Sequence, residues 1–178
     1  MKHILSLAIV AAFSLVAYTS HAQGQNEDKS KRASPPAKVS QTISSGATIT
    51  IDYSQPSLKG RTIGKDVEPM KGKVWRGGAN EATVFQADKA VTIEGKPLPA
   101  GKYSFFVLDN GNDWTLIFNK NWNIWGTEYD KNKSADVLKV NVGKKQSATS
   151  TEKLTYTISK SGKVSLLWGK EDISFNVK

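Results

Sequence analysis

The chain has 178 residues, with 25 Lys and Arg against 16 Asp and Glu, two His and no Cys. This length is typical of one domain built around a single hydrophobic core. The absence of Cys excludes disulfides, thiolate nucleophiles, Cys-ligated zinc, iron–sulfur clusters and thioether-linked haem.

Residues 1–22 have the features of a secretory signal peptide. Lys2 gives a basic start, an apolar run covers residues 4–16, and the small residues Ser20 and Ala22 match an A-x-A-like cleavage site. The apolar run is shorter than the ~20 residues that a membrane-spanning helix needs. We therefore expect cleavage after Ala22 and a periplasmic or secreted product with no membrane span.

Both histidines, His3 and His21, belong to this leader, so the exported product should lack imidazole as well as thiol groups. Nucleophilic sites of the Ser-His-Asp and Cys-His types and His-ligated metals are then excluded. The remaining chemistry uses carboxylates, Lys, Tyr, Ser or oxygen-ligated cations. For this reason we favour a non-catalytic protein over an enzyme.

One loop, residues 109–113, has oxygen-bearing side chains at alternate positions, as calcium loops do. An EF-hand loop needs Gly at its sixth position and Glu at its twelfth, where this chain has Trp114 and Lys120. An Asn-Gly hairpin turn explains the same letters. The sequence predicts neither a metal site nor a cofactor.

The formal net charge is +9 at pH 7, which favours polyanionic partners. Only Arg32, Arg61 and Arg76 are arginines, and Lys lacks the planar fork with which Arg reads phosphates and base edges. The lysines are scattered, with Lys144 and Lys145 the only adjacent two. We therefore expect a glycan or an envelope polyanion as partner, and no nucleic acid.

Residues 23–38 are polar and include two adjacent prolines, which predicts a flexible arm. Residues 39–178 are predicted to form a single β-sandwich domain. Apolar residues there alternate with period two in seven runs. The runs are Ile49/Ile51/Tyr53, Val91/Ile93, Tyr103/Phe105/Val107, Trp114/Leu116/Phe118, Leu154/Tyr156/Ile158, Val164/Leu166/Trp168 and Ile173/Phe175/Val177.

Turn-forming residues separate these runs at 95–101, 109–113, 159–162 and 168–170. No apolar stripe of helical spacing follows the leader, so helices should be short or absent. Segments 54–73 and 141–153 are expected to be irregular. The pattern predicts an all-β fold, an antiparallel two-sheet β-sandwich of jelly-roll-like form, with a closed β-barrel as the alternative.

The densest polar cluster lies in residues 73–83, where two adjacent glycines permit a tight loop. In one interpretation Arg76 clamps a ligand carboxylate or sulfate, with Asn80 and Glu81 beside it and Trp75 as a wall. In the other, Arg76 and Glu81 form an internal ion pair that braces the loop.

Trp122 and Trp125 follow Asn-rich segments and are candidates for stacking on sugar rings. They complete a candidate ligand-binding set of Trp75, Arg76, Asn80, Glu81, Trp122 and Trp125. Our leading hypothesis is an exported, non-catalytic β-sandwich that binds a glycan or another envelope component through this set.

Two alternatives remain. A carboxylate-based hydrolase would use Glu81 and Glu128, placed either ~5–5.5 Å or ~6.5–9.5 Å apart. A purely structural envelope protein would instead bury Arg76 and Glu81 against each other with no adjoining groove.

Four blocks of sequence resemble a known family: IDYSQPSLKGR (51–61), KVWRGGANEAT (73–83), LPAGKYSFF (98–106) and WTLIFNKNWNIWG (114–126). They are similar to the secreted bacterial domain-of-unknown-function family number 2911. The resemblance runs from about Ser34 to the C-terminus. It implies an exported protein of a Gram-negative bacterium and brings no established reaction, substrate or catalytic residues.

Overall fold

The computed structural model describes residues 28–178. The predicted signal peptide and the start of the predicted arm lie outside the described residues. Helical structure in the described part is limited to three short pieces, as expected. They are the 3-10 helix η1 (Lys29–Lys31), α1 (Tyr129–Asn132) and the 3-10 helix η2 (Lys133–Ala135). Over residues 28–178, no helix has the length and apolar character to span a membrane.

Most of the described chain is β-structure, and its strands match most of the predicted alternating runs. The strands are β1 (Pro36–Thr42), β2 (Thr48–Ser54), β3 (Val74–Trp75), β4 (Thr83–Ala87), β5 (Val91–Ile93), β6 (Lys96–Leu98), β7 (Gly101–Asp109), β8 (Asp113–Asn119), β9 (Asp136–Gly143), β10 (Lys145–Ile158) and β11 (Lys163–Asn176).

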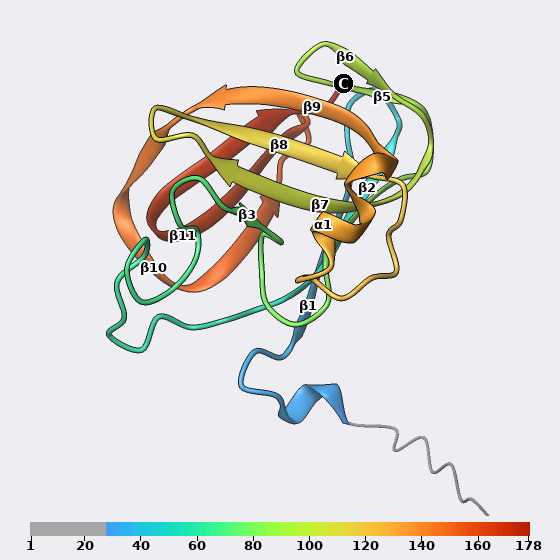
Figure 1. The fold of residues 1–178 in the computed structure, drawn as a ribbon. Helices are drawn as coiled ribbons and strands as arrows, with labels where there is room; N and C mark the ends of the chain where they lie inside the picture. Colours follow the sequence, from blue (N-terminus) through green and yellow to red (C-terminus); the bar gives the residue numbers. More distant parts are fainter. Residues whose placement is uncertain (1–27) are drawn as a thin grey trace, which may run out of the picture.

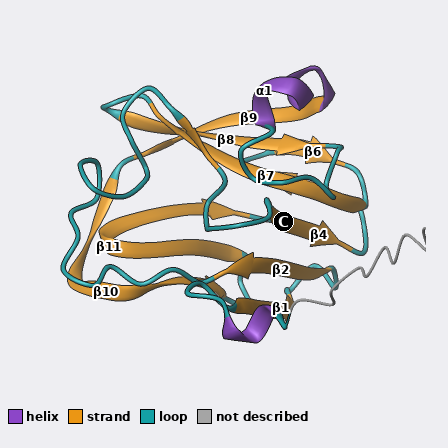
Figure 2. Ribbon diagram, turned by 60° about the horizontal axis from the view of Figure 1, so that its bottom comes forward, coloured by secondary structure: helices purple, strands orange, loops and turns teal. Residues whose placement is uncertain are grey.

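The larger layer is a seven-stranded antiparallel sheet in the order β1-β2-β4-β7-β8-β9, with β3 also pairing with β7. The second layer is the β10–β11 hairpin, and β5–β6 forms a small separate hairpin. Both edge strands of the larger sheet contact the hairpin, β1 through β10 and β9 through β11. The larger sheet therefore curves around the hairpin (Figures 1 and 2). The two-sheet sandwich is confirmed, and the sheet stays open because β1 and β9 do not pair within the described chain.

Aromatic side chains join the two layers. Phe85, Phe105 and Phe118 project from the larger sheet onto Phe175 of β11, with ring centroids 5.7 Å apart for Phe105 and Phe175. Tyr156 of β10 packs beside Phe105 in an edge-on arrangement. Period-two alternation predicts this arrangement, because it directs every second side chain of a strand toward one face.

The β10–β11 hairpin is longer and more curved than the sequence predicts. Segment 141–153, expected to be irregular, is instead the end of β9 and the first part of β10, because backbone pairing between strands does not require apolar side chains. The predicted break at 168–170 is a bend inside β11, where Gly169 has φ 57°. The end of β11 returns to its start, and the Val177 amide donates to the Gly162 carbonyl over 2.8 Å.

Gly77 joins the predicted polar loop to the core. Its carbonyl accepts hydrogen bonds from the hydroxyls of Tyr156 (2.8 Å) and Thr83 (3.3 Å). Its φ of 59° lies in the left-handed region, and a Cβ at this position would overlap the Tyr156 hydroxyl. Only glycine fits here without displacing the buried tyrosine.

We predict that Gly77→Ala lowers the free energy of unfolding by about 1–3 kcal/mol, the usual range for an overpacked core site. Urea unfolding would measure the change. Gly143→Ala is the matched control, since a Cβ there meets no atom within 4 Å and Gly143 has no left-handed φ. Equal stability of the two variants would contradict the packing argument.

Candidate functional site

An open cavity of ≈ 360 Å³ lies between the irregular segment 54–73, the loop that follows β3, and the bend in β11. Arg76 and Arg61 contribute its basic groups, and Asp66 and Glu68 its acidic groups. The indoles of Trp75, from β3, and Trp168, from β11, complete the walls.

Arg76 is the least satisfied polar group in this cavity. Its guanidinium makes no hydrogen bond or ion pair within residues 28–178, although its Nε is fully buried. Burial lowers the pKa of Arg76, and the nearby charge of Glu68 acts in the opposite direction. A guanidinium nevertheless stays protonated in proteins. The cavity therefore contains a fixed positive charge whose donors form no hydrogen bond within the described chain.

The aliphatic part of Arg76 lies directly over Gly126. A Cβ at Gly126 would overlap the Arg76 Cδ, so no other residue fits beneath this side chain. Two backbone hydrogen bonds hold the segment that contains Gly126. The Gly126 amide donates to the Asn80 carbonyl, and the Ala82 amide donates to the Ile124 carbonyl, each over 3.1 Å. The loop after β8 thus supports the arginine from below.

The other charged groups of the cavity are already engaged. Arg61 donates to the carbonyls of Leu58 (3.0 Å) and Ser57 (2.7 Å). Asp66 and Glu68 accept hydrogen bonds from backbone amides of their own loop. These acids keep lone pairs for further donors, because each bond uses only one of their oxygens.

The two indoles hold the loops in place. The Trp75 Nε1 donates to the Gly78 carbonyl over 3.1 Å, and the Trp168 Nε1 donates to the Glu68 carbonyl over 2.8 Å. Both residues are buried, so they serve as walls of the cavity and not as exposed stacking surfaces.

Glu81, expected to pair with Arg76 in the brace interpretation, pairs with the N-terminal segment instead. Its carboxylate accepts two hydrogen bonds from Arg32 Nη1, at 3.0 and 2.9 Å, and lies 2.8 Å from the Lys29 ammonium. The described chain contains no Arg76–Glu81 ion pair. The two residues line different cavities, and the chain turns between them at Asn80, whose φ is 58°.

Asn80 also binds the N-terminal segment, since its Nδ2 donates to the Ser34 carbonyl over 3.0 Å. Residues 28–35, the described part of the predicted arm before β1, are thus held against the loop. Strand β1 begins at Pro36, inside the predicted arm. The order in this segment comes from contacts with residues almost fifty positions away in the sequence.

Trp122 and Trp125 are exposed, with 41% and 45% of their surface accessible, and neither lines the Arg76 cavity. The Lys102 ammonium lies 4.6 Å from the Trp122 ring centroid, a cation–π contact. The backbone of Trp125 pairs with that of Glu81. Trp125 directly precedes Gly126, the residue beneath the Arg76 side chain. Trp125 therefore adjoins the support beneath Arg76.

The six predicted residues thus divide into three groups. Trp75 and Arg76 line the cavity, Asn80 and Glu81 hold the N-terminal segment, and Trp122 and Trp125 lie exposed nearby. Three further residues that line the cavity, Arg61, Glu68 and Trp168, are not among those predicted from the sequence. Arg61 belongs to one of the four family-like blocks, which is the one sequence feature that singled it out.

The described residues contain no group of three or more His, Cys, Asp or Glu side chains placed to hold a metal ion. The charged groups of the cavity are two guanidiniums, which donate hydrogen bonds, and two carboxylates, which accept them. This combination is suited to organic ligands with an acid group and hydroxyls.

The Glu81 ion pairs make a specific prediction about pH. Burial disfavours the charged form, but hydrogen bonds from Lys29, from the Glu81 backbone and from Arg32 outweigh it and lower the pKa of Glu81 to about 2. A carboxyl with a lowered pKa stabilises the folded state above its ordinary pKa of 4.5, and this stabilisation disappears as the pH falls toward 2.

We therefore expect Glu81→Gln to lower the thermal midpoint at neutral pH, and the difference from wild type to vanish near pH 2. Glu128→Gln is the matched control, since the Glu128 carboxylate forms an exposed ion pair with Lys131 at 3.5 Å and its loss should change the midpoint little. A difference for Glu81→Gln that stays constant with pH would show that the ion pairs do not stabilise the fold.

Comparison with known proteins adds one finding to this geometry. The profile of a family described as "Protein of unknown function (DUF2911)" matches residues 34–177, which covers all the strands. Neither curated proteins nor solved structures gave a match. The match confirms the family predicted from the four sequence blocks: this chain belongs to the DUF2911 family.

Proposed function

We propose that this chain is an exported, non-catalytic binding protein whose ligand is a carboxylate-bearing glycan of the cell envelope, held at Arg76. One observation carries the proposal: a half-buried guanidinium with no partner in the described chain lines a cavity of ≈ 360 Å³. That volume lies within the range of small-molecule binding pockets, roughly 300–1,000 Å³.

A buried donor without a partner is unfavourable by about 1–3 kcal/mol, so a fold rarely keeps one without a use. A carboxylate matches the planar guanidinium with two parallel hydrogen bonds. Arg32 and Arg61 already donate to protein oxygens, whereas Arg76 does not. Arg76 is therefore the arginine that a ligand acid would meet.

The rest of the cavity suits the hydroxyls and ring of a sugar. Asp66 and Glu68 offer acceptor lone pairs for hydroxyl donors, and the two indole walls give apolar surface. The exposed Trp125 adjoins the Arg76 support and offers a stacking surface for a longer saccharide. The predicted signal peptide and the basic net charge agree with an acidic partner in the envelope.

The hydrolase alternative has no support from the geometry of Glu81. This carboxylate is held by Arg32 and Lys29, and its lowered pKa keeps it ionised at neutral pH, so it has no proton to donate to a leaving group. Glu128 lies at the start of α1 and contacts Lys131.

We predict that Arg76→Met weakens binding of an oligogalacturonide while leaving the thermal midpoint unchanged or raised. Loss of a charge-assisted bidentate contact should weaken affinity by at least about tenfold. The midpoint should not fall, because the variant removes a buried group that has no partner. Isothermal titration calorimetry and thermal unfolding measure the two quantities.

Lys73→Met is the matched control for loss of one positive charge, since Lys73 is exposed and does not line this cavity. A neutral galactose oligomer of equal length tests the need for the carboxylate. A purely structural role predicts the opposite pattern, in which Arg76→Met lowers the midpoint and no oligosaccharide binds to the wild type.

A further inference from the structure

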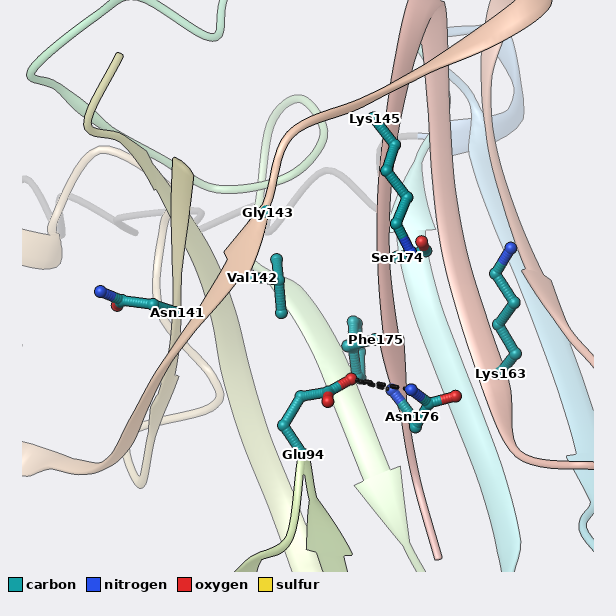
Figure 3. Close-up of a pocket in the computed structure, with 9 residues that line it drawn as sticks. All are labelled: Glu94, Asn141, Val142, Gly143, Lys145, Lys163, Ser174, Phe175 and Asn176. Carbon is teal, nitrogen blue, oxygen red and sulfur yellow. Dashed lines mark hydrogen bonds between the residues drawn. The ribbon is translucent and has the colours of Figure 1, made fainter. Parts of the chain in front are cut away.

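A second cavity, of ≈ 390 Å³, lies at the corner where β9 of the larger sheet passes into β10 of the hairpin (Figure 3). It shares no lining residue with the Arg76 cavity. Its polar groups come from three parts of the chain. These are the β9–β10 corner, strand β11, which contributes residues from both of its ends, and the turn after β5. The polar residues are Asn141, Lys145, Lys163, Ser174, Asn176 and Glu94.

Lys144 and Lys145, the two adjacent lysines, have different surroundings at this corner. The Lys144 ammonium lies 2.6 Å from Asp109 and 4.1 Å from the ring centroid of Trp114, which anchors the corner against the larger sheet. Lys145, the next residue, lines the second cavity. Figure 3 shows its side chain running along β11 toward Ser174.

The curvature of β11 brings a second lysine to the same place. Lys163 begins this strand and Ser174 lies near its end, eleven positions later. Because the Val177 amide donates to the Gly162 carbonyl, the two ends of the strand lie side by side. Lys163 therefore lines the cavity together with Ser174 and Asn176.

Ser174 supplies an unused donor. It is 5% exposed, and its Oγ is buried with no hydrogen-bond partner in the described chain. Neighbouring Ile173 and Phe175 belong to the hydrophobic core, so Ser174 lies on the opposite face of β11. A hydroxyl in such a position is expected to have a partner.

Two carboxylates lie nearby. Glu94 is turned toward Asn176, and its Oε1 accepts from the Asn176 amide at 2.6 Å and from its Nδ2 at 3.1 Å. Asp172 pairs with Lys145 in the strand register and does not line the cavity, and its buried Oδ1 has no hydrogen-bond partner in the described chain. Neither Lys145 nor Lys163 forms an ion pair within residues 28–178. The lining thus offers two free ammonium groups and a free hydroxyl, against one carboxylate that is already hydrogen-bonded.

We propose that this corner cavity, with Lys145, Lys163 and Ser174 as its contacts, is a second binding site, for a sulfate or phosphate group. Tetrahedral oxyanions accept hydrogen bonds in several directions, which suits two flexible ammonium groups and one hydroxyl. The group is either a free ion or an ester on a larger envelope molecule. This site is independent of the carboxylate site proposed at Arg76.

The test is an NMR titration of the protein, in separate experiments, with inorganic sulfate, inorganic phosphate and a sulfated polysaccharide. Backbone amide chemical shifts are measured at each step, at constant ionic strength. Concentrations up to about 10 mM for the inorganic ions cover weak, millimolar binding. We expect saturable shifts at Lys145, Lys163 and Ser174 with at least one inorganic ion for a free-ion site, or with the polysaccharide alone for an ester site.

The double variant Lys145→Gln, Lys163→Gln should weaken this binding at least about tenfold, and Ser174→Ala should weaken it without changing net charge. The double variant Lys160→Gln, Lys170→Gln is the matched control, since both lysines are exposed and lie outside the cavity.

Three results would overturn the proposal. They are shifts spread over the whole basic surface, equal weakening in the two double variants, and no saturable shift with any of the three probes. Since Arg76 takes no part in these measurements, failure here leaves the carboxylate site standing, and failure of that site leaves this one standing.

Discussion

The contact between the Tyr156 hydroxyl and the Gly77 carbonyl connects the core of this protein to the Arg76 cavity. Tyr156 comes from the hairpin layer and packs edge-on against Phe105 of the larger sheet, while its hydroxyl reaches the loop after β3. Burial raises the pKa of Tyr156, so the hydroxyl keeps its proton and remains a donor. The position of the loop, and of Arg76 within it, therefore depends on the packing of the two layers.

Adjacent parts of this loop have different tasks. Trp75 ends β3 and Arg76 begins the loop, and both line the cavity. Asn80 at the turn and Glu81 after it hold the N-terminal segment. The left-handed conformation at Asn80 separates the two halves. Because Glu81 is neutralised by Arg32 and Lys29, it does not neutralise Arg76. The free guanidinium in the cavity thus follows from an ion-pair network that uses other partners.

Both cavities lie where separate parts of the chain meet, and both contain basic groups, while the acids that line them already accept hydrogen bonds from the protein. At Arg76, backbone amides engage Asp66 and Glu68. At the β9–β10 corner, Asn176 engages Glu94. A basic protein can in this way concentrate available positive charge at a few sites, while its other lysines remain scattered over a hydrated surface. The two sites differ in geometry, since one has a rigid planar guanidinium and the other two flexible ammonium groups.

The sequence by itself determined the all-β class, most of the strands, the shortness of the helices and the family. Period-two alternation and turn residues are local features, and they act over the few residues that form one strand or one hairpin. The sequence also made Trp75 and Arg76 candidate site residues, because they belong to its densest polar cluster, and both line one cavity of the structure.

Only the tertiary structure decided which residues meet. Glu81 pairs with Arg32, forty-nine positions away, and not with Arg76, five positions away. The reason is the turn at Asn80, which directs the Arg76 and Glu81 side chains to different cavities. Trp168 reached Glu68 across one hundred positions, and the curved β11 brought Lys163 beside Asn176. Such contacts depend on the bend of strands and the path of loops, and backbone direction at a bend is set by packing between layers that no local pattern encodes.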